Sequence, residues 1–213
     1  MSIMVDTVTQ DELPGVASVL SRAFRDNPGF AGILRGDSPE RRERVLFGCM
    51  LGFARAVLRH GAIEVVRRDG MLVAASLVLP PGAFPMPVRG QLTTASGVLR
   101  SRPGRAHRFA RADYEMHKRH PLAPHHYLWF LGVEPQRQGQ GLGSELLRSL
   151  TSRADAQQQP CYLETDRERN VGLYQGHGFE VLGEAVLPGM DTRMWFMHRP
   201  AVPSGASLER CGP

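Results

Sequence analysis

The feature of this sequence that most constrains its fold is a passage in which an apolar strand leads through alternating glycines into a helix. The predicted strand covers residues 126–133, and glycine then occupies positions 139, 141 and 143 before the helix-forming run Ser-Glu-Leu-Leu at 144–147. Glycine adopts positive φ at no steric cost, so neighbouring N–H groups can point into one concavity. The unpaired N–H groups of the first helical turn would add donors there. The passage therefore predicts a phosphate site at the start of the helix.

The spacing of these glycines excludes two other phosphate-binding loops. The sequence has no Gly-x-x-x-x-Gly-Lys-Ser/Thr, and a Gly-x-Gly-x-x-Gly that begins at Gly139 would require glycine at position 144, which is serine. Neither a P-loop NTPase nor a dinucleotide-binding fold is favoured. A surface turn that simply requires glycine stays open as an alternative at this point.

Two motifs together resemble the GNAT superfamily of acyl-CoA-dependent N-acyltransferases. The first is Gln-Gly-Gln-Gly-Leu-Gly at residues 138–143, similar to the Gln/Arg-x-x-Gly-x-Gly/Ala signature. The second is Asn-Val-Gly-Leu-Tyr-Gln-Gly-His-Gly-Phe at residues 170–179, similar to Asn-x-x-Leu/Phe-Tyr-x-x-x-Gly-Phe, with a β-rich run at 161–165 between the two. The resemblance implies an α/β (α+β) fold with a mixed, mostly antiparallel central sheet flanked by helices. The sheet would splay at the central strand that ends at Val133.

A looser resemblance extends to the puromycin N-acetyltransferase branch of small-molecule acetyltransferases. It is carried by Ala-Phe-Arg-Asp-Asn-Pro at 23–28, Tyr-Leu-Glu-Thr at 162–165 and Met-Trp-Phe-Met-His-Arg at 194–199. This resemblance implies a substrate class, the primary amine of a small molecule such as an antibiotic or a metabolite, and no particular substrate. Residues 80–124 are predicted to shape the acceptor pocket, with four aromatic candidates to line it: Phe109, Tyr114, Trp129 and Phe130.

Acetyl transfer to an amine requires one group that donates a proton and another that removes one. In the resemblance, Tyr174 occupies the position of the tyrosine that protonates the leaving thiolate, and a phenol with a pKa near ~10 stays protonated at neutral pH. An amine with a pKa near ~10 must lose a proton before it attacks, and Glu164 and His125 are the candidate bases. The alternatives that stay open are that Tyr174 packs on the core, that Glu164 is a surface or salt-bridged carboxylate, and that His125 is a solvated histidine at a strand end. The sequence departs from the family pattern at Gly176, because a glycine there is expected to weaken the helix that holds Tyr174.

The resemblance also implies acetyl-CoA as cosubstrate, and it implies no metal. A backbone N–H near residues 131–133 is predicted to meet the thioester oxygen. Gly132 is predicted to let the cofactor approach closely, with a bulge that binds no ligand as the alternative. The predicted cofactor-binding residues are Leu131, Gly132, Val133, Gln138, Gly139, Gln140, Gly141, Leu142, Gly143, Ser144 and Asn170.

Composition excludes several other classes of protein. A chain of 213 residues that is 42% hydrophobic suits one domain, predicted over residues 1–200 and followed by a loose tail at 201–213. The cysteines, Cys49, Cys161 and Cys211, form no Cys-x-x-Cys pair, which argues against disulfides and structural zinc. No apolar run approaches the ~20 residues of a membrane span, and no signal-peptide layout precedes the domain. We expect a cytoplasmic monomer or homodimer with no membrane partner.

The net charge of +5 raises the question of a nucleic-acid partner, because a basic run occupies residues 100–111. A nucleic-acid-binding protein would also carry a recognisable reading module, so a solvated helix face is the preferred interpretation and no nucleic acid is expected. Two other functions stay open: acetylation of a protein lysine or N-terminus, and a non-catalytic CoA-binding regulator. The presence of Tyr174 argues against the regulator.

Breaker residues and periodicity predict the order of the remaining elements. Asp-Gly at 69–70 is a strong hairpin signal, and serine followed by proline at 38–39 is typical of a helix start. The predicted elements are a strand at 2–9, a helix at 10–24 with an Asp cap, breakers at 26–29, a helix at 38–59, paired strands at 62–67 and 71–79, one or two helices within 84–124, and closing strands at 180–187 and 193–198.

Overall fold

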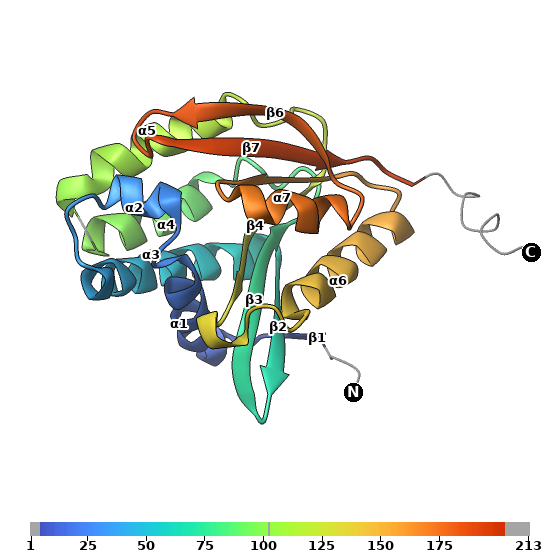
Figure 1. Ribbon diagram of the computed structural model, residues 1–213, viewed down its shortest axis with the longest axis horizontal. Helices are drawn as coiled ribbons and strands as arrows, with labels where there is room; N and C mark the ends of the chain where they lie inside the picture. The colour runs from blue at the N-terminus through green and yellow to red at the C-terminus, as the bar shows by residue number, and fades with distance from the viewer. Residues whose placement is uncertain (1–4, 102, 203–213) are drawn as a thin grey trace, which may run out of the picture.

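The computed structural model describes residues 5–101 and 103–202, and within them one sheet runs through the middle of the molecule (Figure 1). Its strands are β1 (Val5–Thr7), β2 (Ala62–Arg68), β3 (Met71–Leu79), β4 (His126–Val133), β5 (Cys161–Thr165), β6 (Glu180–Leu187) and β7 (Thr192–Arg199). Their spatial order is β1-β2-β3-β4-β5-β7-β6, and only β4 and β5 are parallel neighbours. The predicted mixed, mostly antiparallel sheet is therefore confirmed.

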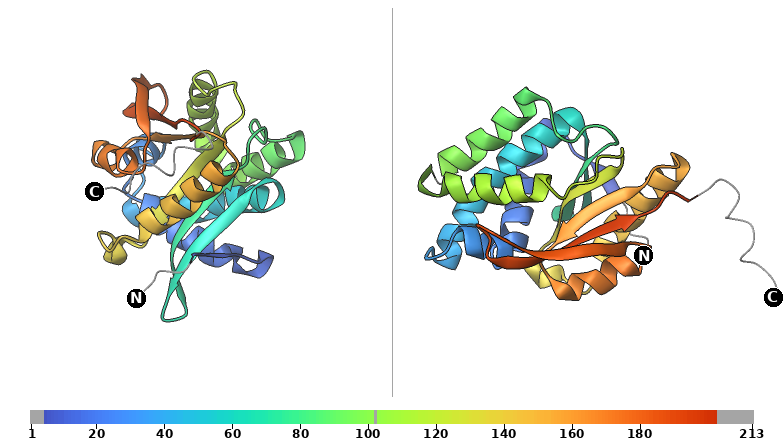
Figure 2. Two further views of the ribbon diagram at one scale, coloured as in Figure 1. Left: turned by 90° about the vertical axis from the view of Figure 1, so that its right-hand side faces the viewer. Right: turned by 90° about the horizontal axis from the view of Figure 1, so that it is seen from above.

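Helices cover both faces of this sheet (Figure 2). On one face lie α1 (Leu13–Phe24), α2 (Pro28–Ile33), α3 (Pro39–His60), α4 (Val88–Ser101) and α5 (Ala106–His117), and on the other lie α6 (Leu142–Ala156) and α7 (Glu168–Gln175). Short 3₁₀ turns occur at η1 (Gln10–Glu12), η2 (Pro103–Arg105) and η3 (Pro135–Arg137). The larger core joins Leu20 and Met50 to the sheet, and a second core joins Leu147 of α6 and Tyr174 of α7 to Leu163.

Several elements have the bounds and the local chemistry that the sequence predicts. Asp69 and Gly70 have φ values of 52° and 75°, as a two-residue hairpin turn of the I′ kind requires. The Ser38 side chain accepts a hydrogen bond from the Arg41 N–H at 3.3 Å and so caps α3. Cys49 and Cys161 are buried and take part in no disulfide among the described residues, and Cys211 lies outside those residues.

Two N-terminal predictions are wrong in detail. The first helix has no Asp cap, because the Thr9 N–H donates to the Glu12 carboxylate at 2.9 Å and this pair begins η1. Residues 26–29, predicted only to break the chain after the first helix, also begin α2. The Asn27 side chain accepts a hydrogen bond from the Phe30 N–H at 3.2 Å and so caps α2. The first strand ends at Thr7 rather than at the predicted residue 9, and residues 1–4 and 203–213 lie outside the described part.

The sheet opens between its two parallel strands. β4 and β5 pair only at His126↔Cys161, Tyr127↔Tyr162 and Leu128↔Leu163. Beyond these pairs β4 stays with β3, while β5 continues along β7 through Glu164 and Thr165. The predicted splay at the strand that ends at Val133 is confirmed. A register shift opposite Leu77 and Val78 also leaves Trp129 as a bulge at the point of divergence.

Candidate active site

A cavity of about 840 Å³ occupies the opening between β4 and β5. It extends from the glycine turn after β4, past the ends of both strands, to α3, α4 and α5 on the helical face. Its volume lies in the range of about 300–1,000 Å³ that small-molecule sites occupy. The end at the glycine turn and the end at α3–α5 differ in chemistry.

The glycine turn forms a cradle of open N–H groups at one end of the cavity. Gly139 and Gly141 have φ values of 78° and 79°, and a Cβ at either position would meet nothing within 4 Å. No side chain caps α6, so the N–H groups of Leu142, Gly143 and Ser144 have no partner inside the helix. This geometry suits a diphosphate bound at the positive end of the helix.

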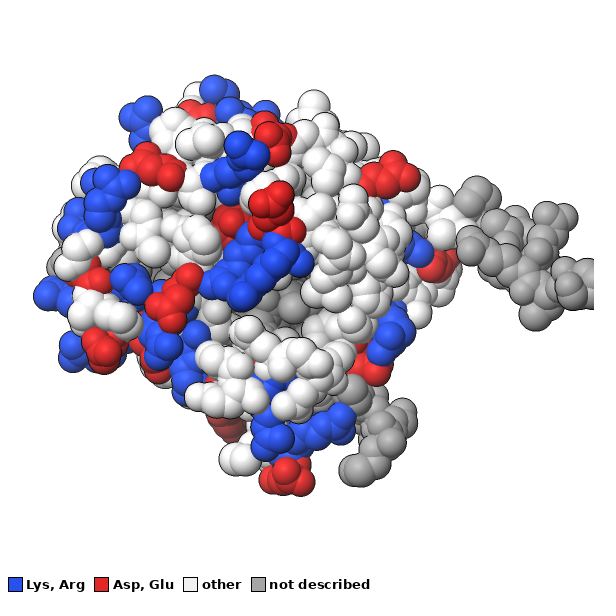
Figure 3. All heavy atoms as spheres, in the orientation of Figure 1, with Lys and Arg blue, Asp and Glu red and all other residues white. Residues whose placement is uncertain are grey.

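Arginine side chains line the same end of the cavity. They are Arg137, Arg167 and Arg169, and the Arg167 Nη2 also donates to the Asp26 carbonyl oxygen at 2.7 Å. Elsewhere on the face shown in Figure 3, basic and acidic side chains are interspersed. Guanidinium groups beside open backbone N–H groups complement a phosphate-bearing ligand, so the residues present fit coenzyme A.

An ion pair anchors the start of this turn. Glu134, which directly follows β4, accepts from Arg22 of α1, whose Nε lies 3.0 Å from both carboxylate oxygens. The Glu134 carboxylate raises the pKa of the Arg22 guanidinium. Since Glu134 is buried, this pair ties α1 to the end of the strand from which the glycine turn leaves.

The edge of β4 that faces the opening offers two more backbone donors. The Glu134 N–H donates to the Val73 carbonyl at 2.9 Å and so points towards β3. Because donors alternate in direction along a strand, the N–H groups of Leu131 and Val133 point away from β3. β5 has already diverged there, so these groups face the cavity, which both residues line.

Gly132 has a packing role that the sequence did not indicate. A Cβ at this position would lie 2.8 Å from Leu20 Cδ2 and 2.9 Å from Ala23 Cβ, both on α1. The glycine is therefore required by the close packing of α1 on β4, and the bulge is at Trp129. Gly132 contributes to the cavity lining, but its missing side chain does not explain how a cofactor would approach.

Tyr174 lines the cavity and is 7% exposed. Burial raises its pKa, with a further contribution from the charge of Asp166, so the phenol keeps its proton at neutral pH. Gly176 does not weaken the helix that carries it, because α7 ends at Gln175 and Gly176 caps it. The Tyr174 carbonyl accepts from the Phe179 N–H at 3.1 Å, and the two rings pack 6.0 Å apart.

The two predicted bases lie in different surroundings. Glu164 lines the cavity with a side chain that is 3% exposed, and its Oε1 has no hydrogen-bond partner among the described residues. His125 is buried behind it and does not line the cavity. Instead its Nε2 lies 2.9 Å from the Nε2 of His120, a residue that no local signal in the sequence singled out.

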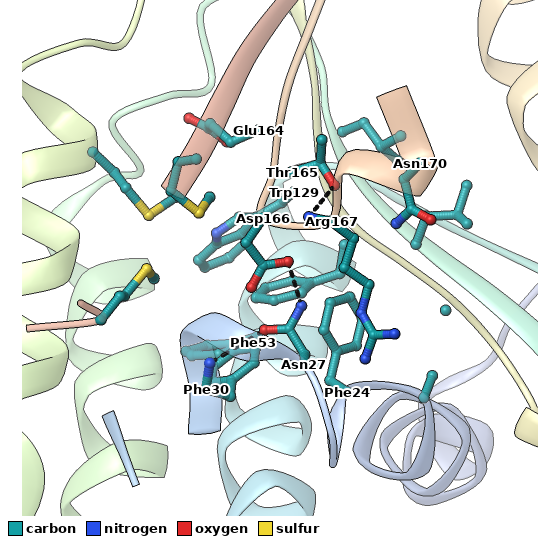
Figure 4. A pocket seen from close by; sticks show the side chains of 18 of the residues that line it. Phe24, Asn27, Phe30, Phe53, Trp129, Glu164, Thr165, Asp166, Arg167 and Asn170 are labelled. Carbon is teal, nitrogen blue, oxygen red and sulfur yellow. Dashed lines mark hydrogen bonds between the residues drawn. The ribbon is translucent and has the colours of Figure 1, made fainter. Parts of the chain in front are cut away.

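A second residue that sequence reasoning missed is Asp166, which follows β5. Its Oδ1 accepts from Asn27 Nδ2 and its Oδ2 from the Gly29 N–H, both at 2.6 Å. Figure 4 shows the Asp166 carboxylate joined to the Asn27 side chain by a hydrogen bond, with Glu164 above them. Burial raises the Asp166 pKa, while these two donors lower it. The two hydrogen bonds attach the start of α2 to the end of β5. The sequence indicated neither partner except through the Asn27-Pro28 pair, which is typical of a helix start.

The end of the cavity away from the glycine turn is rich in aromatic side chains. Three of the four predicted aromatic candidates line it, namely Phe109, Trp129 and Phe130, whereas Tyr114 is 62% exposed and does not. Phe53 stacks on Phe130 with ring centroids 5.3 Å apart. Rings from α1, α2 and α3 enclose this end as well, including Phe24, Phe30 and Phe53 (Figure 4).

The cavity brings together most of the predicted cofactor-binding residues, although they come from β4, the turn, α6 and α7. Those that line it are Leu131, Gly132, Val133, Gln138, Gly139, Gly141, Leu142, Gly143, Ser144 and Asn170. Gln140 is exposed and does not line it. Within residues 5–101 and 103–202, no group of three His, Cys, Asp or Glu residues is placed to hold a metal, and no helix is long and apolar enough to cross a membrane.

Comparisons with known proteins agree with this geometry. A family model described as an acetyltransferase (GNAT) domain matches residues 102–181. A histone acetyltransferase HPA2 and related acetyltransferase from Corynebacterium glutamicum is 25% identical, with a TM-score of 0.67 over 96% of this chain and 99% of that chain. PaiA N-acetyltransferase from Thermoplasma acidophilum, solved with coenzyme A, has a TM-score of 0.54 at 14% identity over 94% and 99%. Arylalkylamine N-acetyltransferase 2 from Aedes aegypti has a TM-score of 0.59 at 13% identity over 94% and 99%.

Proposed function

We propose that this chain, which carries a GNAT acetyltransferase domain, transfers the acetyl group of acetyl-CoA to the primary amine of a small molecule. The observation that carries the proposal is one cavity with two chemically different ends. Open N–H groups and arginines lie at one end, aromatic rings lie at the other, and Tyr174 and Glu164 lie along the same cavity. Direct transfer requires both substrates in contact at one point, and the opening between β4 and β5 provides it.

The glycine turn and the β4 edge would hold the cosubstrate. The N–H groups of α6 at Leu142, Gly143 and Ser144 would bind the diphosphate, and Asn170 would contact the same molecule from α7. Bound acetyl-CoA supplies the acetyl group as a thioester. The N–H groups of Leu131 or Val133 would donate to the thioester oxygen, where negative charge develops during attack.

Tyr174 and Glu164 would handle the two protons of the reaction. Tyr174, protonated because of its burial, would donate its hydroxyl proton to the departing sulfur. Glu164 would remove the proton from the acceptor's ammonium group, since its side chain lines the cavity, whereas His125 does not. His125 is therefore no longer a candidate for direct contact with the amine.

The acceptor end favours a small molecule over a protein. Aromatic rings from several helices and methionine side chains from α5, β7 and two connecting segments enclose it. A protein lysine or N-terminus would require an open groove for the residues that flank it. The arylalkylamine acetyltransferase among the structural neighbours and the looser resemblance to the puromycin N-acetyltransferase branch agree with a small amine. The histone acetyltransferase relative keeps protein acetylation as the second candidate. A cytoplasmic location and a monomer or homodimer remain predictions from the sequence.

Thiol release from acetyl-CoA across a panel of amines and peptides tests the proposal, with mass spectrometry to identify products that gain one acetyl group. We expect turnover with small primary amines and none with peptides. Turnover with peptides but not with small amines would support protein acetylation instead. Coenzyme A binding by calorimetry with no acceptor acetylated would instead favour a non-catalytic regulator.

A further inference from the structure

We infer that Glu164, His120 and His125 form a buried proton-sharing group, called here the Glu-His-His cluster, which as a unit takes the proton from the acceptor amine. The role in turnover rests on the proposed acetyl transfer. The cluster itself is a property of the protein without substrate, so it can be tested separately.

The three side chains come from separate parts of the chain and meet behind the cavity. Glu164 is on β5, His120 lies in the turn after α5, and His125 directly precedes β4. His120 Nδ1 lies 3.7 Å from Glu164 Oε1, and His120 Nε2 lies 2.9 Å from His125 Nε2. The side chains of His120 and Glu164 are 6% and 3% exposed, so bulk water does not solvate the contact between them.

The hydrogen-bond partners determine how many protons the cluster holds. His125 Nδ1 lies 2.7 Å from the Ala123 carbonyl oxygen, which can only accept, so this nitrogen carries a proton. Two imidazole nitrogens at 2.9 Å need one proton between them. His120 Nδ1 and Glu164 Oε1 lie 3.7 Å apart, which is too long for a hydrogen bond, so this contact requires no proton. With Glu164 as a carboxylate, the cluster therefore holds the two protons of two neutral imidazoles, and its net charge is −1.

A proton added to this form can lie on Glu164, His120 or His125, and a small side-chain movement that closes the 3.7 Å contact would let it pass from Glu164 to His120. If it is on Glu164, both histidines are neutral; if it is on either histidine, Glu164 is a carboxylate opposite a cationic imidazole pair. Such strongly coupled groups titrate together, so the proton belongs to the cluster. Without the added proton the net charge is −1, which is the form able to accept a proton.

The groups around the cluster exclude water from it, and few of them are charged. The Phe84 ring lies 4.0 Å from the His120 ring, and the rings of Tyr127 and Tyr162 lie 4.6 and 4.8 Å from it. Burial and the negative charge of Glu164 raise the pKa of both tyrosines, so they stay neutral. The other titratable groups that face the cluster are Asp113 and His117 of α5 and His198 of β7.

Within the cluster only Glu164 lines the cavity, so it makes the contact with the acceptor, and His120 and His125 act through it as positioning residues. The acceptor's ammonium group loses one proton and becomes a neutral amine. The cluster gains that proton, and its charge changes from −1 to zero. Release of the proton to solvent restores the starting state. Activity should therefore fall on the acid side near the range where imidazole titrates, about pH 6–7, rather than where a carboxylate does.

NMR titration of the histidine imidazoles in the full chain tests the cluster without any substrate. We expect the signals of His120 and His125 to move together in one pH step. Glu164→Gln should move that step to lower pH by about one unit or more, because the imidazoles lose their negative partner. His107→Gln is the matched control: His107 is exposed on α5, and its removal should leave the step unchanged. Independent steps for His120 and His125, unaffected by Glu164→Gln, would overturn the cluster.

The pH dependence of kcat/KM tests the role in turnover. In His120→Gln the base is reduced to Glu164 alone, so the acid limb should move by about 2 units to lower pH, the difference between imidazole and carboxyl groups. The KM for acetyl-CoA should stay within about twofold, because the glycine turn is untouched, and His107→Gln should match wild type. If His120→Gln does not fold, His125→Gln provides the same comparison, with a shift in the same direction.

The outcomes separate the two proposals. An acid limb that does not move in a folded His120→Gln or His125→Gln protein refutes the catalytic role of the cluster. If no amine is acetylated, the proposed function fails, and the NMR titration alone supports or overturns the cluster.

Discussion

Replacement of Gly141 by alanine separates backbone strain from ligand binding in the glycine turn. Gly141 has a φ of 79°, and an added Cβ would meet no protein atom within 4 Å. The substituted protein should therefore fold, at the cost of a left-handed residue, about 1 kcal/mol. In a domain of this size that lowers Tm by about 2–4 °C.

The effect on coenzyme A affinity should be larger. The Cβ of alanine would fill space beside the open N–H groups where the diphosphate is proposed to bind, and it would weaken a hydrogen bond to a charged group. Such a bond contributes about 1.5–3 kcal/mol, which corresponds to a rise in Kd of about 10- to 150-fold. Gly139→Ala, at a φ of 78° and with the same open surroundings, should behave in the same way.

Gly70→Ala is the matched control. Gly70 has a φ of 75°, and a Cβ there would also meet nothing within 4 Å, but it lies in the β2–β3 hairpin and does not line the cavity. Calorimetric unfolding should give similar losses of stability in Gly141→Ala and Gly70→Ala. Titration calorimetry with coenzyme A should distinguish them, because only Gly141→Ala weakens binding. Equal affinity in wild type and both variants would refute the assignment of the turn as the diphosphate site.

Three further predictions concern turnover, packing and pH. Tyr174→Phe should lower kcat by about 100-fold or more with the coenzyme A affinity unchanged, and a steady-state rate within about twofold of wild type would reject the acid role. Gly132→Ala should reduce the free energy of unfolding by about 1–3 kcal/mol in urea, because its Cβ would lie 2.8 Å from Leu20 Cδ2; wild-type stability would contradict the close packing of α1 on β4. Burial lowers the pKa of His126 below its ordinary 6.5, so the unfolded chain binds more protons and stability is lost as the pH falls below that value. Urea unfolding of His126→Gln at several pH values should show a shallower loss than wild type, and parallel curves would rule this contribution out.

The local features of the fold and site were predictable because each depends on the backbone angles or hydrogen bonds of a few neighbouring residues. Asp69-Gly70 can adopt the two positive φ angles of a tight hairpin, Ser38 offers an oxygen to an unpaired helix N–H, and the glycines at 139 and 141 allow the turn before α6. Tyr174 was predictable because it lies within a motif. For Gly132 the neighbouring motif suggested a ligand, and no local signal showed that atoms of α1 also require a glycine there.

The sequence by itself determined the order of strands and helices, the glycine turn, and the residue types that suit transfer to an amine. The family resemblance implied a splay at the strand that ends at Val133 and a donor near residues 131–133. Only the tertiary structure decided that β4 and β5 part after Leu128 and Leu163, and hence that the N–H groups of Leu131 and Val133 are the ones that face the cavity. It also decided that Glu164 meets His120 and His125. Hydrogen bonds within a turn or cap act over a few residues, so a sequence pattern records them. Contacts between a strand and a distant turn depend on how the whole chain packs, and no local pattern carries that information.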